Sequence, residues 1–356
     1  MRILYGVVGE GMGHATRSRV ILEHLTQSHD VHVVASGRAF DYLKARFSGV
    51  HRIFGYTLAY EDNAVHALKT VLGNLQGAVH GAPANVLEYV QLARNFRPEA
   101  IITDFESWSY LFGRNHRLPI LSIDNMQVIN RCRHPPEIIQ GHERDFELSR
   151  AIVKAKVPGA SRYLITTFFD ALVRKERTSL VPPILRPEIL AARPDTGEHL
   201  LVYQTSTSAG DLPGALKASG LPCRIYGFRR DLTAPEIDGA LTYQPFSEES
   251  FIEDLRTCRG VVGNGGFTLM SEAIYLHKPF LSAPVGGQFE QVLNARYLQQ
   301  AGYGQHAETI DAPTLAGFIG RLPDFARALS SYQQDGNTAT FGEVDAFLAT
   351  LATLRA

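Results

Sequence analysis

The chain has 356 residues, of which 45% are hydrophobic and 20% charged, a balance that excludes a disordered or fibrous protein and predicts more than one compact core. Lysine and arginine number 35 against 36 for aspartate and glutamate, so no general electrostatic field attracts nucleic acid or an anionic membrane. The three cysteines, Cys132, Cys223 and Cys258, lie far apart without a C-x-x-C motif, which excludes a disulfide framework and predicts buried thiols. No run reaches the roughly eighteen apolar residues of a membrane span. We expect a cytoplasmic protein whose contact with a membrane is at most peripheral.

The first half of the chain alternates strand and helix patterns. Residues 2–8 form an apolar run that predicts a buried strand. Helix, strand and helix patterns follow over 16–28, 31–35 and 39–47, and further strands are expected over 100–103, 118–123 and 163–166. This alternation is typical of a parallel sheet covered by helices.

A proline-rich segment separates this half from a second one. Four prolines fall within residues 181–194, which disfavours a helix, so we interpret 181–198 as a linker. Strand patterns restart after it over 199–203, 223–226, 261–262 and 280–281, with helix patterns over 248–256, 268–276 and 289–300. The sequence thus predicts an α/β protein with two Rossmann-like domains, 1–180 and 199–335, facing each other across a cleft at the carboxyl ends of their strands.

A glycine-rich turn joins the first strand to the first helix. Gly11 and Gly13 in this turn allow backbone N–H groups to approach an anion or a substrate. No Gly-Lys-Ser/Thr follows, so the turn is not a Walker loop, and its G-x-G-x-G spacing differs from the dinucleotide pattern. Arg38 after the second strand would suit NADP, and an NADP-dependent oxidoreductase stays as a weaker alternative.

His14 stands where this turn meets the helix, a position from which its ring can project into the cleft. Histidine is well matched to proton abstraction near neutral pH. Asp104 follows the strand at 100–103, and a carboxylate bonded to the imidazole would fix its tautomer and stabilise the imidazolium. Two other interpretations of Asp104 stay open: an N-cap of the next helix, or a D-x-E metal pair with Glu106.

The most specific pattern lies in the second half. A strand at 261–262 leads into Gly265-Gly266, followed by a helix that carries Glu272. The N–H groups at the start of such a helix can hold a diphosphate. Two prolines and the run Glu290-Gln291-x-x-Asn-Ala follow, so the segment can contact a sugar nucleotide at three points.

Taken together, these motifs resemble the GT-B nucleotide-sugar glycosyltransferases, especially the UDP-glycosyltransferases and the N-acetylglucosaminyltransferase that makes lipid II. The resemblance covers the Gly-His turn, the segment at Asp104 and the signature over 264–295. It implies an inverting hexosyltransferase that moves a sugar from a nucleotide diphosphate sugar to a small-molecule or lipid-linked acceptor. UDP is the first expectation for the nucleotide, with TDP or GDP as alternatives, and neither a metal nor a cofactor besides this co-substrate is expected. The resemblance also implies that 336–356 is a helix crossing back towards the N-terminal domain.

The resemblance implies roles for individual residues as well. His14 aligns with the catalytic base and Asp104 with the aspartate that orients it. The expected donor-binding residues are Gly265, Gly266, Phe267 and Thr268 at the diphosphate, Glu272 at the ribose, Glu290 and Gln291 at the sugar hydroxyls, Phe246 at the base, and Thr205 and Ser206 near the phosphates.

One position departs from the family pattern. UDP-glycosyltransferases carry a diphosphate-binding histidine where this chain has Asn264, and asparagine donates a hydrogen bond but brings no charge. We expect Arg17 or Arg19 to supply a cation across the cleft instead.

The acceptor is not identified by the sequence. Its pocket is expected between Tyr56 and Tyr89 and between Asn125 and His142. Arg131, Arg133 and His134 in the second segment either favour an anionic acceptor or form a solvated basic face. Two other functions stay open: a GT-B-fold sugar-nucleotide epimerase and a non-catalytic nucleotide-sugar-binding protein.

Overall fold

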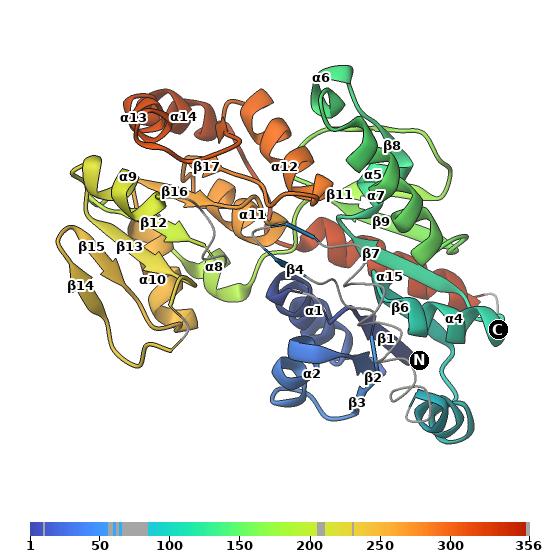
Figure 1. Cartoon of the computed structure of the whole chain (residues 1–356). Helices are drawn as coiled ribbons and strands as arrows, with labels where there is room; N and C mark the ends of the chain where they lie inside the picture. Colours follow the sequence, from blue (N-terminus) through green and yellow to red (C-terminus); the bar gives the residue numbers. More distant parts are fainter. Residues whose placement is uncertain are drawn as a thin grey trace.

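A computed structural model shows two α/β lobes, each built on a seven-stranded sheet (Figure 1). It describes residues 1–9, 11–55, 60–61, 64–65, 85–204, 211–229 and 231–353. The predicted fold class, two Rossmann-like sheets in one chain, is therefore confirmed.

The sheet of the N-terminal lobe is parallel throughout, in the order β11-β9-β7-β6-β1-β2-β3. Its strands are β1 (Arg2–Val7), β2 (Asp30–Ala35), β3 (Val50–Arg52), β6 (Ala100–Asp104), β7 (Ile120–Asp124), β9 (Arg162–Thr166) and β11 (Thr178–Val181). The central strands are apolar on both faces, because helices cover the sheet on either side. Short ribbons pair β8 (Cys132–Arg133) with β10 (Leu172–Val173) and β4 (Tyr60–Glu61) with β5 (Ala64–Val65).

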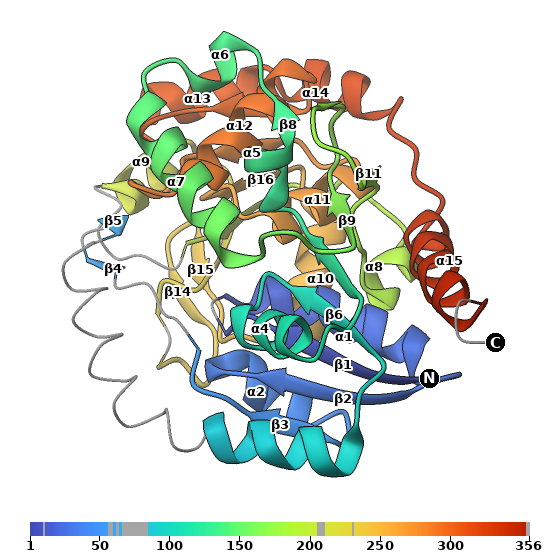
Figure 2. The ribbon, with the colours of Figure 1, turned by 90° about the vertical axis from the view of Figure 1, so that its right-hand side faces the viewer.

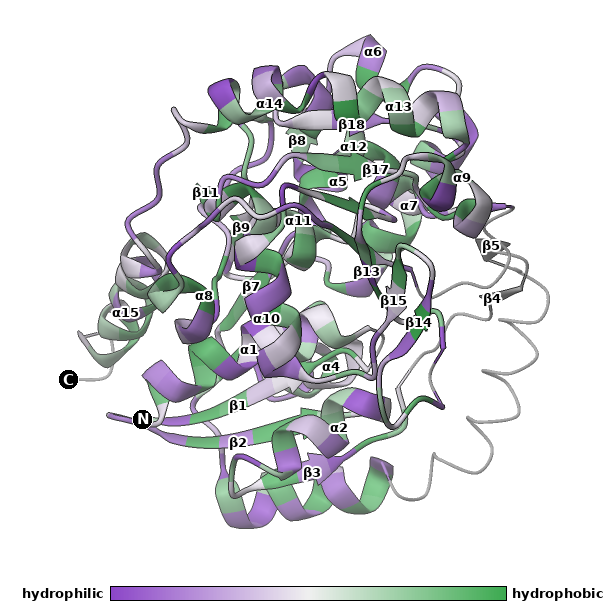
Figure 3. Ribbon diagram, turned by 90° about the vertical axis from the view of Figure 1, so that its left-hand side faces the viewer, coloured by the Kyte–Doolittle hydropathy of each residue, from purple (hydrophilic) through white to green (hydrophobic). Residues whose placement is uncertain are grey.

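Helices connect these strands, so the carboxyl ends of the parallel strands lie at the same edge of the sheet. They are α1 (Met12–Leu25), α2 (Gly37–Lys44), the π-helix η1 (Leu92–Phe96), α4 (Ser107–Asn115), α5 (Gln127–Arg131), α6 (Pro136–Ile139) and α7 (Glu143–Lys156). In Figure 3 the strands β1 and β2 are largely hydrophobic, whereas the surrounding helices mix both colours. That contrast is expected for helices that bury one face only.

The C-terminal lobe repeats the design in the order β14-β15-β13-β12-β16-β17-β18. Its strands are β12 (Leu200–Tyr203), β13 (Cys223–Tyr226), β14 (Glu236–Asp238), β15 (Leu241–Tyr243), β16 (Gly260–Gly263), β17 (Phe280–Ser282) and β18 (Gly304–His306), of which the edge strand β14 runs antiparallel to its neighbour. Its helices are α9 (Leu212–Ala218), α10 (Glu248–Thr257), α11 (Phe267–Tyr275), α12 (Phe289–Gln300), α13 (Ala312–Gly320) and α14 (Leu322–Leu329).

The structure of the segment between the two sheets differs from the prediction in one respect. The predicted linker contains the short helix α8 (Pro187–Ala191), although its prolines led us to expect none. Pro187 occupies the first helical turn, where proline lacks only an N–H that has no partner in any helix, so it starts a helix instead of breaking it.

The last helix returns to the first lobe. After α14 the chain runs to α15 (Thr338–Thr353), which lies beside the N-terminal sheet in Figure 2. Val344, Phe347 and Leu348 are buried in the same hydrophobic cluster as Ile3 and Ile21. Apolar side chains on one face of α15 thus tie the end of the chain to the first domain.

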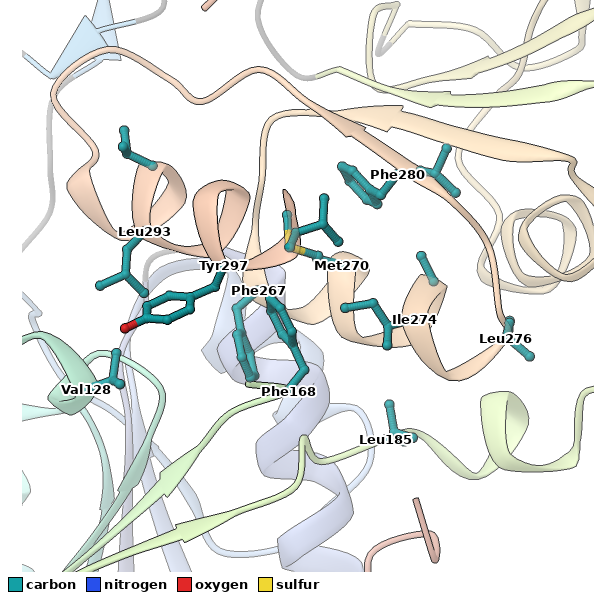
Figure 4. Close-up of a cluster of buried hydrophobic side chains, with 14 of the residues drawn as sticks. Val128, Phe168, Leu185, Phe267, Met270, Ile274, Leu276, Phe280, Leu293 and Tyr297 are labelled. Atoms are coloured by element: carbon teal, nitrogen blue, oxygen red, sulfur yellow. The ribbon is translucent and has the colours of Figure 1, made fainter. Parts of the chain in front are cut away.

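A hydrophobic cluster joins the two lobes. Val128 and Phe168 of the N-terminal lobe pack there with Phe267, Leu293 and Tyr297 of the C-terminal lobe (Figure 4). The ring of Phe169 stacks on Tyr297 at 3.8 Å. This contact fixes how the ends of the two sheets face one another.

The three cysteines are all buried and free, as predicted. Within the described residues, no helix combines the length and the apolar character needed to cross a bilayer.

Candidate active site

His14 and Asp104 form a hydrogen-bonded pair at the carboxyl edge of the N-terminal sheet. Asp104 ends β6, opposite Val7 of the adjacent β1, and His14 lies in the first turn of α1, which follows β1. His14 Nδ1 lies 2.8 Å from Asp104 Oδ1. The carboxylate is 1% exposed and the imidazole 18%, so the aspartate is buried behind a ring that reaches the surface of the site. The structure therefore brings the two predicted residues together.

Arg17 completes this group from the same helix. Its Nε donates to Asp104 Oδ2 at 2.7 Å and its Nη2 to Asp104 Oδ1 at 2.5 Å. Ser18 Oγ adds a third donor to Oδ2 at 3.1 Å. Asp104 is thus held in one orientation by a bidentate guanidinium, a hydroxyl and the imidazole.

These contacts set the protonation of the pair. Burial alone would raise the pKa of Asp104, but Arg17 and His14 hold that pKa well below its usual range. Burial, and then the charge of Arg17, lower the pKa of His14, while Asp104 acts in the opposite direction. Near pH 7 the pair is therefore a carboxylate and a neutral imidazole. A neutral ring is the form that can accept a proton.

The segment after Asp104 bears on its two other interpretations. Glu106, not Asp104, caps α4, since its carboxylate accepts from the backbone N–H groups of Trp108 and Ser109 at 2.7 and 2.6 Å. The two carboxylates thus bind different partners. In the described part of the chain, no three His, Cys, Asp or Glu side chains gather as metal ligands would.

The two glycine turns meet across the lobes. A Cβ on Gly13 would come within 2.6 Å of Thr268 Oγ1, so a side chain at position 13 would displace Thr268. Thr268 lies in the first turn of α11, whose N-cap, Gly266, offers no side-chain hydrogen bond. The N–H groups of that first turn therefore have no side-chain cap among the described residues.

Unpartnered polar atoms gather beside this turn. Asn264 Oδ1 and Ser282 Oγ are both buried without a hydrogen-bond partner. A Cβ on Gly265 would lie 2.7 Å from Ser282 Oγ, so the serine borders the turn directly. Around Gly266, by contrast, no other residue that the structure describes comes within 4 Å of such a Cβ, its chain neighbours aside. Buried polar atoms without partners beside open space are typical of a site that a polar ligand completes.

Glu290 links the turn to the N-terminal lobe. Its Oε1 accepts from Asn125 Nδ2 at 2.8 Å and from Asn294 Nδ2 at 2.7 Å. Asn294 Nδ2 also lies 3.1 Å from the carbonyl oxygen of Gly265. The neighbouring Gln291 bonds within its own segment, to Val285 N and to Gln288. Glu290 therefore stands between the two lobes, whereas Gln291 supports the loop before α12.

Glu272 is buried in an ion pair. Arg186, which precedes α8, donates from Nε and Nη2 to the two carboxylate oxygens at 2.7 and 2.8 Å. Arg186 also donates to Glu248 Oε1 at 2.7 Å. The predicted ribose contact thus lies next to a cation from the linker, a partner that the sequence did not indicate.

The remaining predicted residues lie apart from this group or outside the described residues. Phe246 is 68% exposed. Arg17 and Arg19 are paired with Asp104 and Glu188, so the structure gives both expected diphosphate cations carboxylate partners. Thr205, Ser206 and most of the predicted acceptor segment from Tyr56 to Tyr89 are outside the described residues. In the other acceptor segment, Arg131 is buried, and its guanidinium donates to Thr178 Oγ1 and to the carbonyl oxygen of Glu176.

Sequence reasoning missed Arg186, and it placed Asn125 in the acceptor segment without giving it a role of its own. Asn125 follows the end of β7, the strand beside β6, so its position after a neighbouring strand was an available signal. Arg186 comes from a proline-rich connection, where no periodicity indicates which side chains turn inward.

Comparisons with known proteins show the family and the fold. Residues 1–323 match the family model described as glycosyl transferase family 1. The chain belongs to this family. A curated relative, an uncharacterized glycosyltransferase of Methanosarcina mazei, is 24% identical over 346 residues, covering 86% of this chain and 85% of its own.

Solved structures give the same fold for this glycosyltransferase. The Phytolacca americana UGT2, solved with UDP-2-fluoro-glucose and pterostilbene, superposes with a TM-score of 0.66 at 15% identity and 99% coverage of both chains. The Acinetobacter baumannii MurG superposes with a TM-score of 0.60 at 16% identity, covering 97% of this chain and 98% of its own. The protein is a glycosyltransferase of the GT-B fold.

Proposed function

We propose that the protein is an inverting hexosyltransferase that transfers a sugar from a nucleotide diphosphate to an acceptor hydroxyl or amine without a metal ion. One observation carries the proposal: the His14–Asp104 pair lies beside the contact between Gly13 and Thr268. Thr268 belongs to the first turn of α11. A proton acceptor and an uncapped helix N-terminus thereby border one site.

His14 would act through its Nε2 atom. Asp104 binds the Nδ1 side of the ring, so a ring with its proton on Nδ1 leaves the lone pair on Nε2 free. The acceptor oxygen attacks the anomeric carbon as its proton passes to Nε2. The bond from that carbon to the diphosphate oxygen breaks, and the diphosphate leaves with the electron pair. Attack from the face opposite the leaving group inverts the anomeric configuration.

The C-terminal lobe would bind the leaving group. The free N–H groups at the start of α11 can donate to a diphosphate, and the helix dipole favours the negative charge that develops on it. Asn264 and Ser282 provide further polar atoms beside the turn. We assign Glu290 to the donor sugar and Glu272 to the ribose, as the family resemblance implies. We test a UDP-sugar first because the Phytolacca americana structure holds one.

Thermal shift with UDP-, TDP- and GDP-hexoses tests the donor. At 100 times Kd a ligand stabilises the folded state by about 2.7 kcal/mol, which for a chain of this size raises Tm by several degrees. The stabilising donor is then supplied with a panel of phenols, amines and lipid alcohols, and release of the nucleotide and the anomeric configuration of the product are measured.

A His14→Ala variant completes the test. It should lose transfer by about 10²- to 10⁴-fold while keeping the thermal shift with the donor. Wild-type transfer by this variant, or a product that retains the anomeric configuration, contradicts the proposal. Isomerised nucleotide sugar without an acceptor product would identify an epimerase instead, and a requirement for a divalent metal would contradict metal independence.

A further inference from the structure

We infer that Arg17 is a positioning residue for the proposed base: its guanidinium orients Asp104 against His14 and places a positive charge beside the imidazole ring. The inference rests on the proposed role of His14. It assigns Arg17 a task in the N-terminal lobe instead of contact with the donor diphosphate.

The geometry of Arg17 leaves it little freedom. Its side chain is 4% exposed and binds both oxygens of Asp104 through Nε and Nη2. Nη2 also lies 2.7 Å from His14 Nδ1. Guanidinium and imidazole therefore converge on one carboxylate oxygen, Oδ1, and a change in one alters the position of the other.

A continuous set of hydrogen bonds extends this arrangement to the other lobe. Arg17 Nη1 donates to Asn125 Oδ1 at 2.5 Å, and Asn125 Nδ2 donates to Glu290 Oε1 at 2.8 Å. Arg17 is thus connected to Glu290 of the C-terminal lobe through Asn125. Lysine, with a single ammonium group, cannot form these three directed contacts at once.

The charge of Arg17 balances that of Asp104. A lone buried carboxylate beside a histidine favours the imidazolium, which cannot accept a proton. Among the described residues, the charged groups facing His14 are Asp104 from β6, Arg17 from α1 and Lys156 from α7. Two further acids, Asp124 of β7 and Glu290 of α12, interact with Arg17. With Arg17 paired to Asp104, the nearest opposite charges offset each other, and the buried ring stays neutral.

The test measures the titration of His14 directly, so it needs no substrate. Nuclear magnetic resonance of protein labelled with 15N-histidine gives the protonation and tautomer of each ring, and the His14 signals are assigned by their loss in His14→Gln. In wild type we expect a pKa below the usual 6.5 and the proton on Nδ1. In Arg17→Met the pKa should rise by about one to three units, because the cation that lowers it is gone.

Arg19→Met is the matched control. Arg19 is a second buried cation on α1, but its guanidinium binds Glu188 at 2.6 Å, so this variant should leave the titration of His14 unchanged. Arg17→Lys retains a charge and should keep the pKa close to wild type while changing the tautomer balance. An unchanged His14 pKa in folded Arg17→Met overturns the inference.

A second pair of variants covers the case in which Arg17→Met does not fold. Arg17→Met with Asp104→Asn removes both charges, and its comparison with Asp104→Asn alone isolates the guanidinium. The His14 pKa should be higher in the double variant, and an equal value overturns the inference.

Activity then separates this inference from the proposed function. Release of UDP from UDP-glucose is followed against pH, and the acid limb should move upward in Arg17→Met together with the titration of His14. A titration shift with wild-type activity in His14→Gln contradicts the proposed base but leaves the effect of Arg17 on the ring. Loss of activity in His14→Gln without any titration shift in Arg17→Met contradicts the role of Arg17 alone.

Discussion

The two lobes bring opposite kinds of polar group to the site. On the N-terminal side, Asp104 accepts hydrogen bonds from His14, Arg17 and Ser18. On the C-terminal side, Asn264 Oδ1 and Ser282 Oγ are buried without partners, and no side chain caps α11. One half is thus bonded before any substrate arrives, whereas the other has polar atoms for a ligand to satisfy. Changes in the N-terminal half should therefore affect rate, and changes in the C-terminal half should affect binding.

The largest effect is expected from a change in the N-terminal half of the site, whose hydrogen bonds form without a substrate. Asp104→Asn removes the charge that stabilises the imidazolium formed during transfer, so kcat/KM should fall by about 10²- to 10⁴-fold. Because Asp104 raises the pKa of His14, the acid limb of the pH profile should also move to lower pH. Donor affinity, measured by calorimetry, should stay near wild type.

Asp345→Asn is the matched control for that variant. Asp345 Oδ1 lies 2.8 Å from His24 Nε2 in a second histidine–aspartate pair, between α15 and α1. Its carboxylate is 53% exposed, and its loss should leave the rate and the pH profile unchanged. An upward shift of the acid limb in Asp104→Asn would contradict the assignment of the pair.

The next effect concerns Glu272 and tests stability and binding together. Glu272→Ala leaves Arg186 buried without its bidentate partner, which should cost about 3 kcal/mol of unfolding free energy, the lower end for a broken buried pair because Glu248 remains beside it. Urea denaturation measures this loss. Affinity for UDP should also fall if the carboxylate binds the ribose.

A double variant separates the two consequences. Glu272→Ala with Arg186→Met removes the uncompensated cation, so it should recover part of the stability. The affinity for UDP should remain low. Recovery of both would show that Glu272 supports the fold alone and takes no part in binding.

A smaller effect compares two adjacent glycines of the donor turn. Gly265 has φ +97° and its Cβ would meet Ser282 Oγ, so Gly265→Ala should destabilise the fold by about 1–3 kcal/mol. Gly266 has φ −60° and open space beside it, so Gly266→Ala should keep the wild-type Tm. Its methyl group should nevertheless weaken UDP binding severalfold, because it enters the space in front of α11. Unchanged UDP affinity would place the diphosphate elsewhere.

The sequence predicted the parts of this site that follow from local pattern. Apolar runs located the central strands, and their carboxyl ends located His14 and Asp104. Side-chain pairs across long separations were beyond such patterns: Arg186 and Glu272 are 86 residues apart, and nothing in either segment indicates the other. The sequence predicted Arg17 as a cation for the donor diphosphate, whereas in the structure it pairs with Asp104. Nothing in the sequence around Arg17 distinguishes these two partners.

The smallest expected effect concerns Phe246, whose ring is 68% exposed and 6.3 Å from that of Phe251. An exposed aromatic ring contributes little to the folded state, so Phe246→Ala should change the unfolding free energy by less than about 0.5 kcal/mol. If the ring stacks on the base of the donor, its loss should cost about 0.5–1.5 kcal/mol of binding, roughly two- to tenfold in Kd. Phe246→Tyr retains the stack and should bind UDP as wild type does. The loss should be absent for a ligand that lacks the base, so inorganic diphosphate, tested as a competitor of UDP, should bind the Ala variant and wild type equally. Equal weakening for UDP and diphosphate would show that the loop containing Phe246 shapes the diphosphate turn and does not contact the base.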